Sequence, residues 1–189
     1  MNNLDRRRLL RLLFLTGIGL LAIVSAASAT TLTRLQFAEL AQESTAVARL
    51  RCLDSESRWE RGEIWTETRF EVLEQEKGLL PVIVTVRTLG GNAGHLHSRV
   101  DGVPVFHPGE EVYLFLWWQE GEAYSVLGWS QGTFRIAKNL RTGAETVTQD
   151  SAAMPVFDPQ KREFRREGTR NLPVSIFREK LRSTLEHKP

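Results

Sequence analysis

The chain of 189 residues contains 41% hydrophobic residues, 25 lysines and arginines, 23 aspartates and glutamates, and a single cysteine. This length suits one domain with a sizeable core, and the sequence contains no internal repeat or low-complexity segment. One cysteine excludes a framework of internal disulfides, so packing must stabilise the fold.

The first 29 residues have the pattern of a secretory signal peptide. A basic stretch, residues 5–11, precedes an apolar stretch, residues 12–26, and the small residues 27–29 form a cleavage site before Thr30. We therefore expect a periplasmic or secreted protein that meets the membrane only through this segment before cleavage. A retained membrane anchor is the alternative. The arginines also resemble a twin-arginine signal, so the Sec and twin-arginine routes both stay open.

Removal of the signal peptide changes the charge of the chain. That segment holds four arginines and one aspartate, which leaves 21 basic and 22 acidic side chains in residues 30–189. Residues 159–189 are basic, with nine basic against four acidic side chains, and the body before them is acidic. Such a tail can bind anionic lipid or polysaccharide, but we expect it to fold back on its own domain.

The mature chain begins with one short helix and a first strand. Apolar residues at helical spacing predict an amphipathic helix over residues 32–44. Residues 45–53 alternate as a strand, with Cys52 facing the small apolar side, where nothing local would activate a thiol and a structural role is expected. Residues 55–62 are polar and end in Gly62, which predicts a connection.

The next segments alternate between apolar and polar side chains. Residues 64–76 and 82–89 are therefore expected to form two strands. Gly90 opens a wide, glycine-rich loop that continues to His107.

Residues 110–118 are expected to form the strand around which the rest is organised. Its apolar side chains alternate between two faces, Val112, Leu114, Leu116 and Trp118 on one and Tyr113, Phe115 and Trp117 on the other. A strand that is apolar on both faces must be covered twice. Shorter strands are expected at residues 123–129, 133–137 and 145–148, with a turn at residues 138–143.

The end of the chain changes character. Residues 151–172 are polar and charged with little periodicity, which predicts a polar arm. Residues 173–189 predict a closing helix, because Val174, Phe177 and Leu181 recur at helical spacing after Pro173. The elements together predict a mostly β, antiparallel, barrel-like domain over residues 30–150, followed by the arm and the helix.

Three short motifs carry a resemblance to a known family. They are Phe70-Glu71-Val72 before Lys77-Gly78, the alternating residues 82–86, and Pro108-Gly109-Glu110 before Val112-Tyr113-Leu114. In this order they resemble the OB-fold barrel in its netrin-like form, shared by the tissue inhibitors of metalloproteinases. The resemblance covers residues 45–135 and implies a fold. Those inhibitors bind the protease zinc through an N-terminal cysteine held by disulfides, whereas Cys52 lies in mid-strand, so inhibition is not implied.

The chain also resembles exported bacterial proteins that carry a Gly-Gly loop and a Gly-Glu turn before an apolar strand. Gly90-Gly91 and Gly109-Glu110 are the residues that carry this second resemblance. It implies export and leaves the activity open.

Residues 128–132, with Ser130 at their centre, fit the Gly-x-Ser-x-Gly pattern of the serine hydrolase nucleophile elbow. Asp150 or Asp158 and then His187 follow in the order that a catalytic triad requires. An elbow needs a helix after the serine, whereas the residues that follow here predict a strand. A hairpin turn explains the two glycines better, and a small hydrolase stays an alternative.

Three histidines form a candidate metal site. His95 and His97 are at alternate positions, so on a strand they face the same way, and His107 can approach from the returning arm of the loop. Three histidines leave one coordination position open, as in a catalytic zinc or a copper site. The alternative is that these are exposed loop residues without a ligand, and no other cofactor is expected.

Trp65, Trp117 and Trp129, with Asn92 in the wide loop, are the expected contact surface. Barrels of this kind use aromatic side chains to stack on bases or sugars. The acidic body opposes a phosphate backbone, so a protein segment or a neutral glycan in the cell envelope fits better than nucleic acid. Core packing is the alternative use of these tryptophans.

These patterns together predict an exported module that binds a partner and is not an enzyme. A metal-binding protein or a small hydrolase is one alternative. A structural envelope component retained by an uncleaved N-terminus is another.

Overall fold

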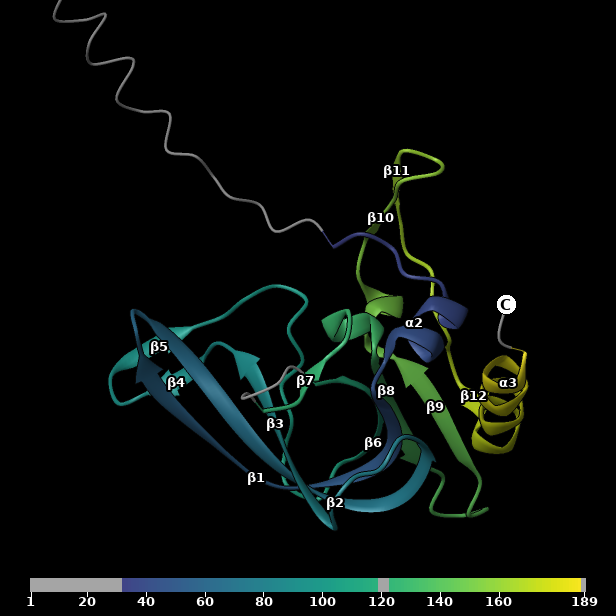
Figure 1. Ribbon diagram of the computed structural model, residues 1–189, viewed down its shortest axis with the longest axis horizontal. Helices are drawn as coiled ribbons and strands as arrows, with labels where there is room; N and C mark the ends of the chain where they lie inside the picture. The colour runs from purple at the N-terminus through teal and green to yellow at the C-terminus, as the bar shows by residue number, and fades with distance from the viewer. Residues whose placement is uncertain (1–31, 119–122, 188–189) are drawn as a thin grey trace, which may run out of the picture. The chain divides into compact units, whose positions relative to one another are not determined.

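The computed structural model describes residues 32–118 and 123–187, which belong to the unit Thr31–Pro189 (Figure 1). The signal peptide predicted over residues 1–29 lies outside the described residues. None of the described helices is long and apolar enough to cross a membrane.

β-Strands are the commonest regular structure of the described chain. The strands are β1 (Ala46–Glu60), β2 (Glu63–Lys77), β3 (Ile83–Leu89), β4 (Gly91–Ala93), β5 (Leu96–Ser98), β6 (Glu111–Trp117), β7 (Ser125–Val126), β8 (Thr133–Lys138), β9 (Glu145–Gln149), β10 (Val156–Asp158), β11 (Glu163–Arg165) and β12 (Leu172–Pro173). The helices are α2 (Phe37–Glu43), α3 (Val174–Glu186) and the 3-10 turns η1 (Trp129–Gln131) and η2 (Asp150–Ala153).

One antiparallel sheet organises these strands (Figure 1). Its order is β12, β9, β8, β6, β1, β2, β3, and β7 pairs with β6. The hairpins β4–β5 and β10–β11 form separate two-stranded sheets. The prediction of a mostly β, antiparallel fold with a helix near each end is confirmed.

Strand β6 is buried on both faces, as its alternation predicts. Val112, Leu114 and Leu116 pack in a first core with residues of β1, β2 and β3. Tyr113 and Phe115 pack in a second core beneath the two helices. The sheet therefore has one core on each side of its central strand, and α3 closes the second one.

The hairpin of β1 and β2 is longer than the alternation suggests. Residues 55–62 were expected to be a connection, but β1 continues through them and turns at Arg61 and Gly62, both with positive φ. The polar side chains find cross-strand partners, because the Ser55 and Thr68 hydroxyls are hydrogen-bonded at 2.8 Å. Polarity in this stretch marks a solvated strand pair and not a loop.

The first core is only partly enclosed by paired strands. Val86 on β3 forms an isolated parallel bridge with Tyr124, and Arg87 N donates to Tyr124 O at 2.7 Å. No closed barrel is found among the described strands. The antiparallel sheet is thus established, and the OB-like closure of it is not.

The ends of the unit are more ordered than the sequence predicts. Helix α2 is shorter than the expected 32–44 because Gln36 and Glu39 form a capping box at its start. The expected polar arm contains η2 and the hairpin β10–β11, and Ser151 and Asp158 within it are 2% exposed. This arm packs against the segment before α2, since Arg34 N donates to Phe157 O at 2.9 Å.

Candidate functional site

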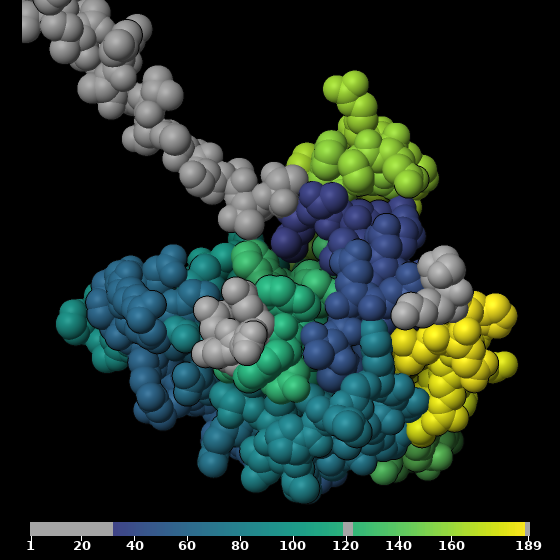
Figure 2. Space-filling view, in the orientation of Figure 1, coloured from purple at the N-terminus to yellow at the C-terminus, as the bar shows by residue number. Residues whose placement is uncertain are grey.

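A cavity of about 300 Å³ lies between the segment before α2, the arm and helix α3. Figure 2 shows these three parts together, the first in purple, the arm in yellow-green and α3 in yellow. The lining residues are Arg34, Leu35, Gln36, Phe37, Gln131, Gln149, Ser151, Val156, Arg165, Glu167, Gly168, Thr169 and Lys180. They come from segments far apart in the chain, so only the folded molecule contains this site.

Two glutamines build the inner wall of the cavity. Gln131 Nε2 donates to Thr33 O and its Oε1 accepts from Leu35 N, each at 2.8 Å. Gln149 Nε2 donates to Gln131 O at 2.6 Å, and its Oε1 accepts from Thr169 N at 3.2 Å. Both amides are therefore satisfied, and they join the N-terminal segment, the sheet and the arm into one wall.

Charged side chains form the rim. Glu167 spans two guanidinium groups, with Oε2 at 2.8 Å from Arg34 Nη2 and Oε1 at 2.6 Å from Arg165 Nη1. Arg34 also pairs with Asp158 at 2.9 Å. The backbone N–H of Lys161, together with Gln160 N–H and Arg34, holds the pKa of Asp158 below its ordinary value. Asp158 is consequently a carboxylate at neutral pH.

Lys180 supplies the remaining cation of the rim. Its Nζ lies 4.4 Å from the ring centroid of Phe37, a cation–π contact. Within residues 32–118 and 123–187 no carboxylate forms an ion pair with Lys180. Arg165 also pairs with Glu163 at 3.2 Å, so each guanidinium group of the cavity contacts two carboxylates, whereas the ammonium of Lys180 contacts none among the described residues.

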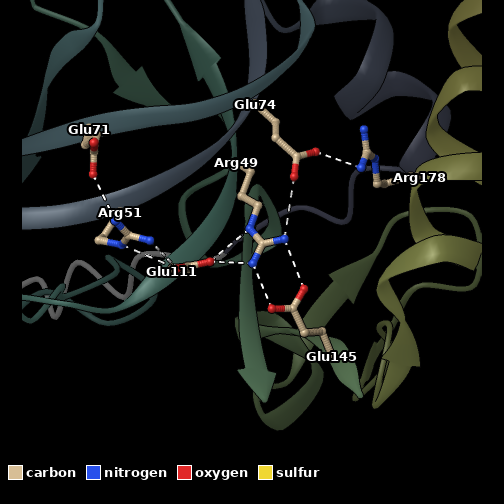
Figure 3. A network of polar contacts seen from close by, with 7 residues as sticks. All are labelled: Arg49, Arg51, Glu71, Glu74, Glu111, Glu145 and Arg178. Atoms are coloured by element: carbon tan, nitrogen blue, oxygen red, sulfur yellow. Dashed lines mark hydrogen bonds and ion pairs between the residues drawn. The ribbon is translucent and has the colours of Figure 1, made fainter. Parts of the chain in front are cut away.

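A separate charged network fixes the helix that bears Lys180 (Figure 3). Arg178 of α3 lies 2.8 Å from Glu74 on β2, and Glu74 in turn lies 3.6 Å from Arg49 on β1. Arg178 also pairs with Glu76 at 2.8 Å. The ion pairs hold α3 against the sheet and so determine where Lys180 meets the cavity.

The phenol of Tyr113 lies beside this network in the second core. Its hydroxyl is buried and has no hydrogen-bond partner among the residues that the structure describes. Burial, with Glu74 nearby, raises the pKa of Tyr113 to about 12. Tyr113 is therefore a neutral core residue at physiological pH.

The three predicted metal ligands are not brought together. His95 lies in the turn between β4 and β5, and the ring of His97 on β5 contacts the Asn92 side chain. His107 lies in the turn before β6, where its backbone N–H donates to the Glu110 carboxylate. The described part of the chain contains no group of three His, Cys, Asp or Glu side chains placed to hold a metal ion.

The residues of the predicted tryptophan surface come from four different elements. Trp65 on β2 is covered by Arg87, whose guanidinium lies 4.5 Å from the ring centroid. Trp117 is 43% exposed at the end of β6, and Trp129 lies in η1 with a φ of 53°. Asn92 pairs with His97 on a separate hairpin. These residues belong to different elements, and no ring contact joins the three tryptophans within the described residues.

The serine motif has the geometry of a turn. Ser130 lies in the 3-10 turn η1, which leads into strand β8, and its hydroxyl is buried without a partner among the described residues. Its expected triad members are engaged elsewhere: Asp150 binds Arg135, Asp158 binds Arg34, and His187 Nδ1 contacts Ser183 O. The arrangement does not assemble a nucleophile, a base and an orienting acid.

Sequence reasoning missed the cavity because its residues carry no local pattern. Gln131 lies inside the serine motif, and Arg165 and Glu167 lie inside the arm. In such segments a polar residue is normally taken to indicate solvent exposure. The burial of Gln131, 3% exposed, is visible only in the fold.

No protein-family model, curated protein or solved structure matches this chain.

Proposed function

We propose that this protein is an exported, non-enzymatic binding module that holds its ligand in the cavity beside α3. Ligand sites of proteins are concave and pre-formed, with apolar walls and a few convergent polar groups. Phe37, Leu35 and Val156 supply apolar surface in the cavity, and Lys180 with Ser151 supplies polar groups.

The observation that carries the proposal is the rigid construction of the wall. The side-chain amides of Gln131 and Gln149 use their hydrogen bonds to hold the N-terminal segment and the arm in place. A wall that is ordered before binding loses little conformational entropy when a ligand enters. This supports a binding site more than a surface crease between loosely packed segments.

The expectation that the protein is not a hydrolase is supported by the turn at Ser130. Ser130 is 2% exposed and its hydroxyl is buried, so the hydroxyl cannot reach a substrate without local unfolding. The ion pair of Asp150 with Arg135 occupies one candidate acid.

We also propose the finer fold predicted from the sequence, an OB-like barrel of the netrin-like form. The bridge between Val86 and Tyr124 supports it, because it links β3 to the segment that leads into β7, which pairs with β6. Export is proposed from residues 1–29. A protein or glycan of the cell envelope stays the expected partner.

The binding test uses the protein purified after export, with whatever N-terminal processing the cell has carried out. Native mass spectrometry and thermal-shift measurements with peptides, organic acids and glycans should identify ligands that raise the unfolding temperature. Thr169→Trp fills the cavity rim and should abolish the shift, whereas Thr85→Trp on strand β3 should keep it. A shift that survives Thr169→Trp would move the site elsewhere and overturn the proposal.

The test of export is the mass of the same purified protein. Cleavage predicts a chain that begins at Thr30. An intact N-terminus would instead favour the structural envelope component.

A further inference from the structure

We propose that the cavity beside α3 selects a ligand with one carboxylate group attached to an apolar or aromatic body. This inference rests on the proposed function and adds the chemical class of the ligand. It follows from the charges of the rim and from the apolar residues below them.

The first step is the ammonium that the rim leaves without a carboxylate partner. Asp158, Glu163 and Glu167 already pair with Arg34 and Arg165, while Lys180 has only its contact with Phe37 within the described residues. One unpaired ammonium can bind one carboxylate group. A phosphate dianion would leave a negative charge without a partner in the cavity.

The second step is the geometry of the guanidinium pair. Glu167 occupies the position between Arg34 and Arg165 at 2.8 and 2.6 Å, so a ligand carboxylate has to bind at Lys180 and away from Glu167. There it can receive a charge-assisted hydrogen bond from the ammonium group. The hydroxyl of Ser151, which has no hydrogen bond to any described residue, is a further donor in the lining.

The third step is the apolar part of the lining. The ring of Phe37, the side chain of Leu35 and the buried Val156 line the same cavity. A ligand with a hydrocarbon or aromatic body buries that surface, whereas a small inorganic anion leaves it wet. A free aromatic acid and the C-terminal end of a peptide share this chemistry.

The experiment measures binding of N-acetylphenylalanine to the exported protein by calorimetry, with N-acetylphenylalanine amide and inorganic phosphate as matched probes. We expect the acid to bind at least about tenfold more tightly than either, because the amide lacks the charge that Lys180 binds and phosphate lacks the apolar body. Lys180→Met keeps the apolar stem over Phe37 and should weaken the acid about tenfold, while Lys138→Met on β8 should not. Glu167→Gln frees a guanidinium charge and should let phosphate bind.

Equal affinity for acid and amide, or an unchanged affinity in Lys180→Met, would overturn the carboxylate assignment. A neutral ligand whose binding is blocked by Thr169→Trp would also overturn the carboxylate assignment. The proposal of a binding module would then still hold. If none of the tested compounds binds in the cavity, both the binding module and the carboxylate selectivity are overturned. A peptide that ends in phenylalanine, compared with its amidated form, separates a peptide terminus from a free acid as the source, since only the former gains affinity from preceding residues.

Discussion

Arg49 Nη2 lies 3.0 Å from Glu145 Oε1, although 96 positions separate the two residues in the chain. The same guanidinium donates hydrogen bonds to Glu111 of β6 and forms an ion pair with Glu74 of β2 (Figure 3). Burial lowers the pKa of Arg49, but its bonds with Glu145 and Glu111 outweigh this and raise it. One cation thus joins four strands, β1, β2, β6 and β9, on the face of the sheet beside α3.

Arg49→Met should destabilise the protein by about 2 kcal/mol, because it removes the cation that pairs with Glu145 and leaves Glu111 with Arg51 alone. The expected loss is smaller than for a fully buried pair, since both glutamates are about one quarter exposed. Urea unfolding followed by fluorescence measures it. Arg58→Met removes a solvent-exposed pair with Glu56 and should leave stability nearly unchanged. Equal effects of the two substitutions would contradict a structural role of the network.

Phe177→Ala should destabilise the protein by about 3–5 kcal/mol and loosen α3. Phe177 is fully buried and its ring contacts Tyr113 and Phe134, with centroids 4.9 and 5.0 Å apart. Thermal unfolding and amide hydrogen exchange of the α3 residues measure the two effects. Ile176→Ala is the control, because that neighbouring side chain is 48% exposed and its loss should be nearly neutral. Unchanged exchange in α3 would show that the second core does not hold the helix.

Gly132→Ala should destabilise the protein by about 1–3 kcal/mol, although the φ of Gly132, −89°, suits any residue. An added Cβ would lie 2.1 Å from Leu127 O, so the backbone of the turn would have to move. Chemical denaturation measures the loss. Ser130→Ala is the comparison within the same motif, and we expect it to be neutral or stabilising, because it removes a buried hydroxyl without a partner among the described residues. An esterase activity that disappears in Ser130→Ala would overturn the structural reading of the motif.

Acid should destabilise the fold through Glu111. Burial raises the pKa of Glu111, but hydrogen bonds from Arg49 and Arg51 lower it below the ordinary value. A carboxyl whose pKa is lower in the folded state contributes stability that is present above its unfolded pKa and lost as the pH falls through the folded pKa. The free energy of unfolding should therefore fall as the pH drops below the ordinary glutamate range. Glu111→Gln should flatten this fall, and an unchanged pH profile would contradict the assignment.

The central strand shows what local pattern can predict. Val112, Leu114 and Leu116 alternate with Tyr113 and Phe115, and the two sets pack in the two cores as expected. Helix α3 follows the same logic, because Val174, Phe177 and Leu181 are its buried residues. In both cases the periodicity of the backbone decides which side chains share a face. A few neighbouring residues in the sequence are enough to recognise that periodicity.

The candidate sites show where local pattern fails. His95, His97 and His107 are close in sequence, but β4 and β5 pair with each other and His107 returns toward β6 by a separate turn. The motif around Ser130 matches a hydrolase in letters, yet the strand that follows and the burial of the hydroxyl make it a turn. The spacing of residues in a sequence does not determine where a loop places their side chains in space.

The sequence by itself determined the mostly β class, the central strand covered on both faces and the closing helix, because each depends on periodicity within a few residues. Only the tertiary structure decided that Arg34 meets Glu167, that Arg49 meets Glu145 and that Lys180 stands over Phe37. These contacts join segments whose separation along the chain carries no periodic signal. They form because the sheet order and the docking of the arm and α3 bring those segments together in space.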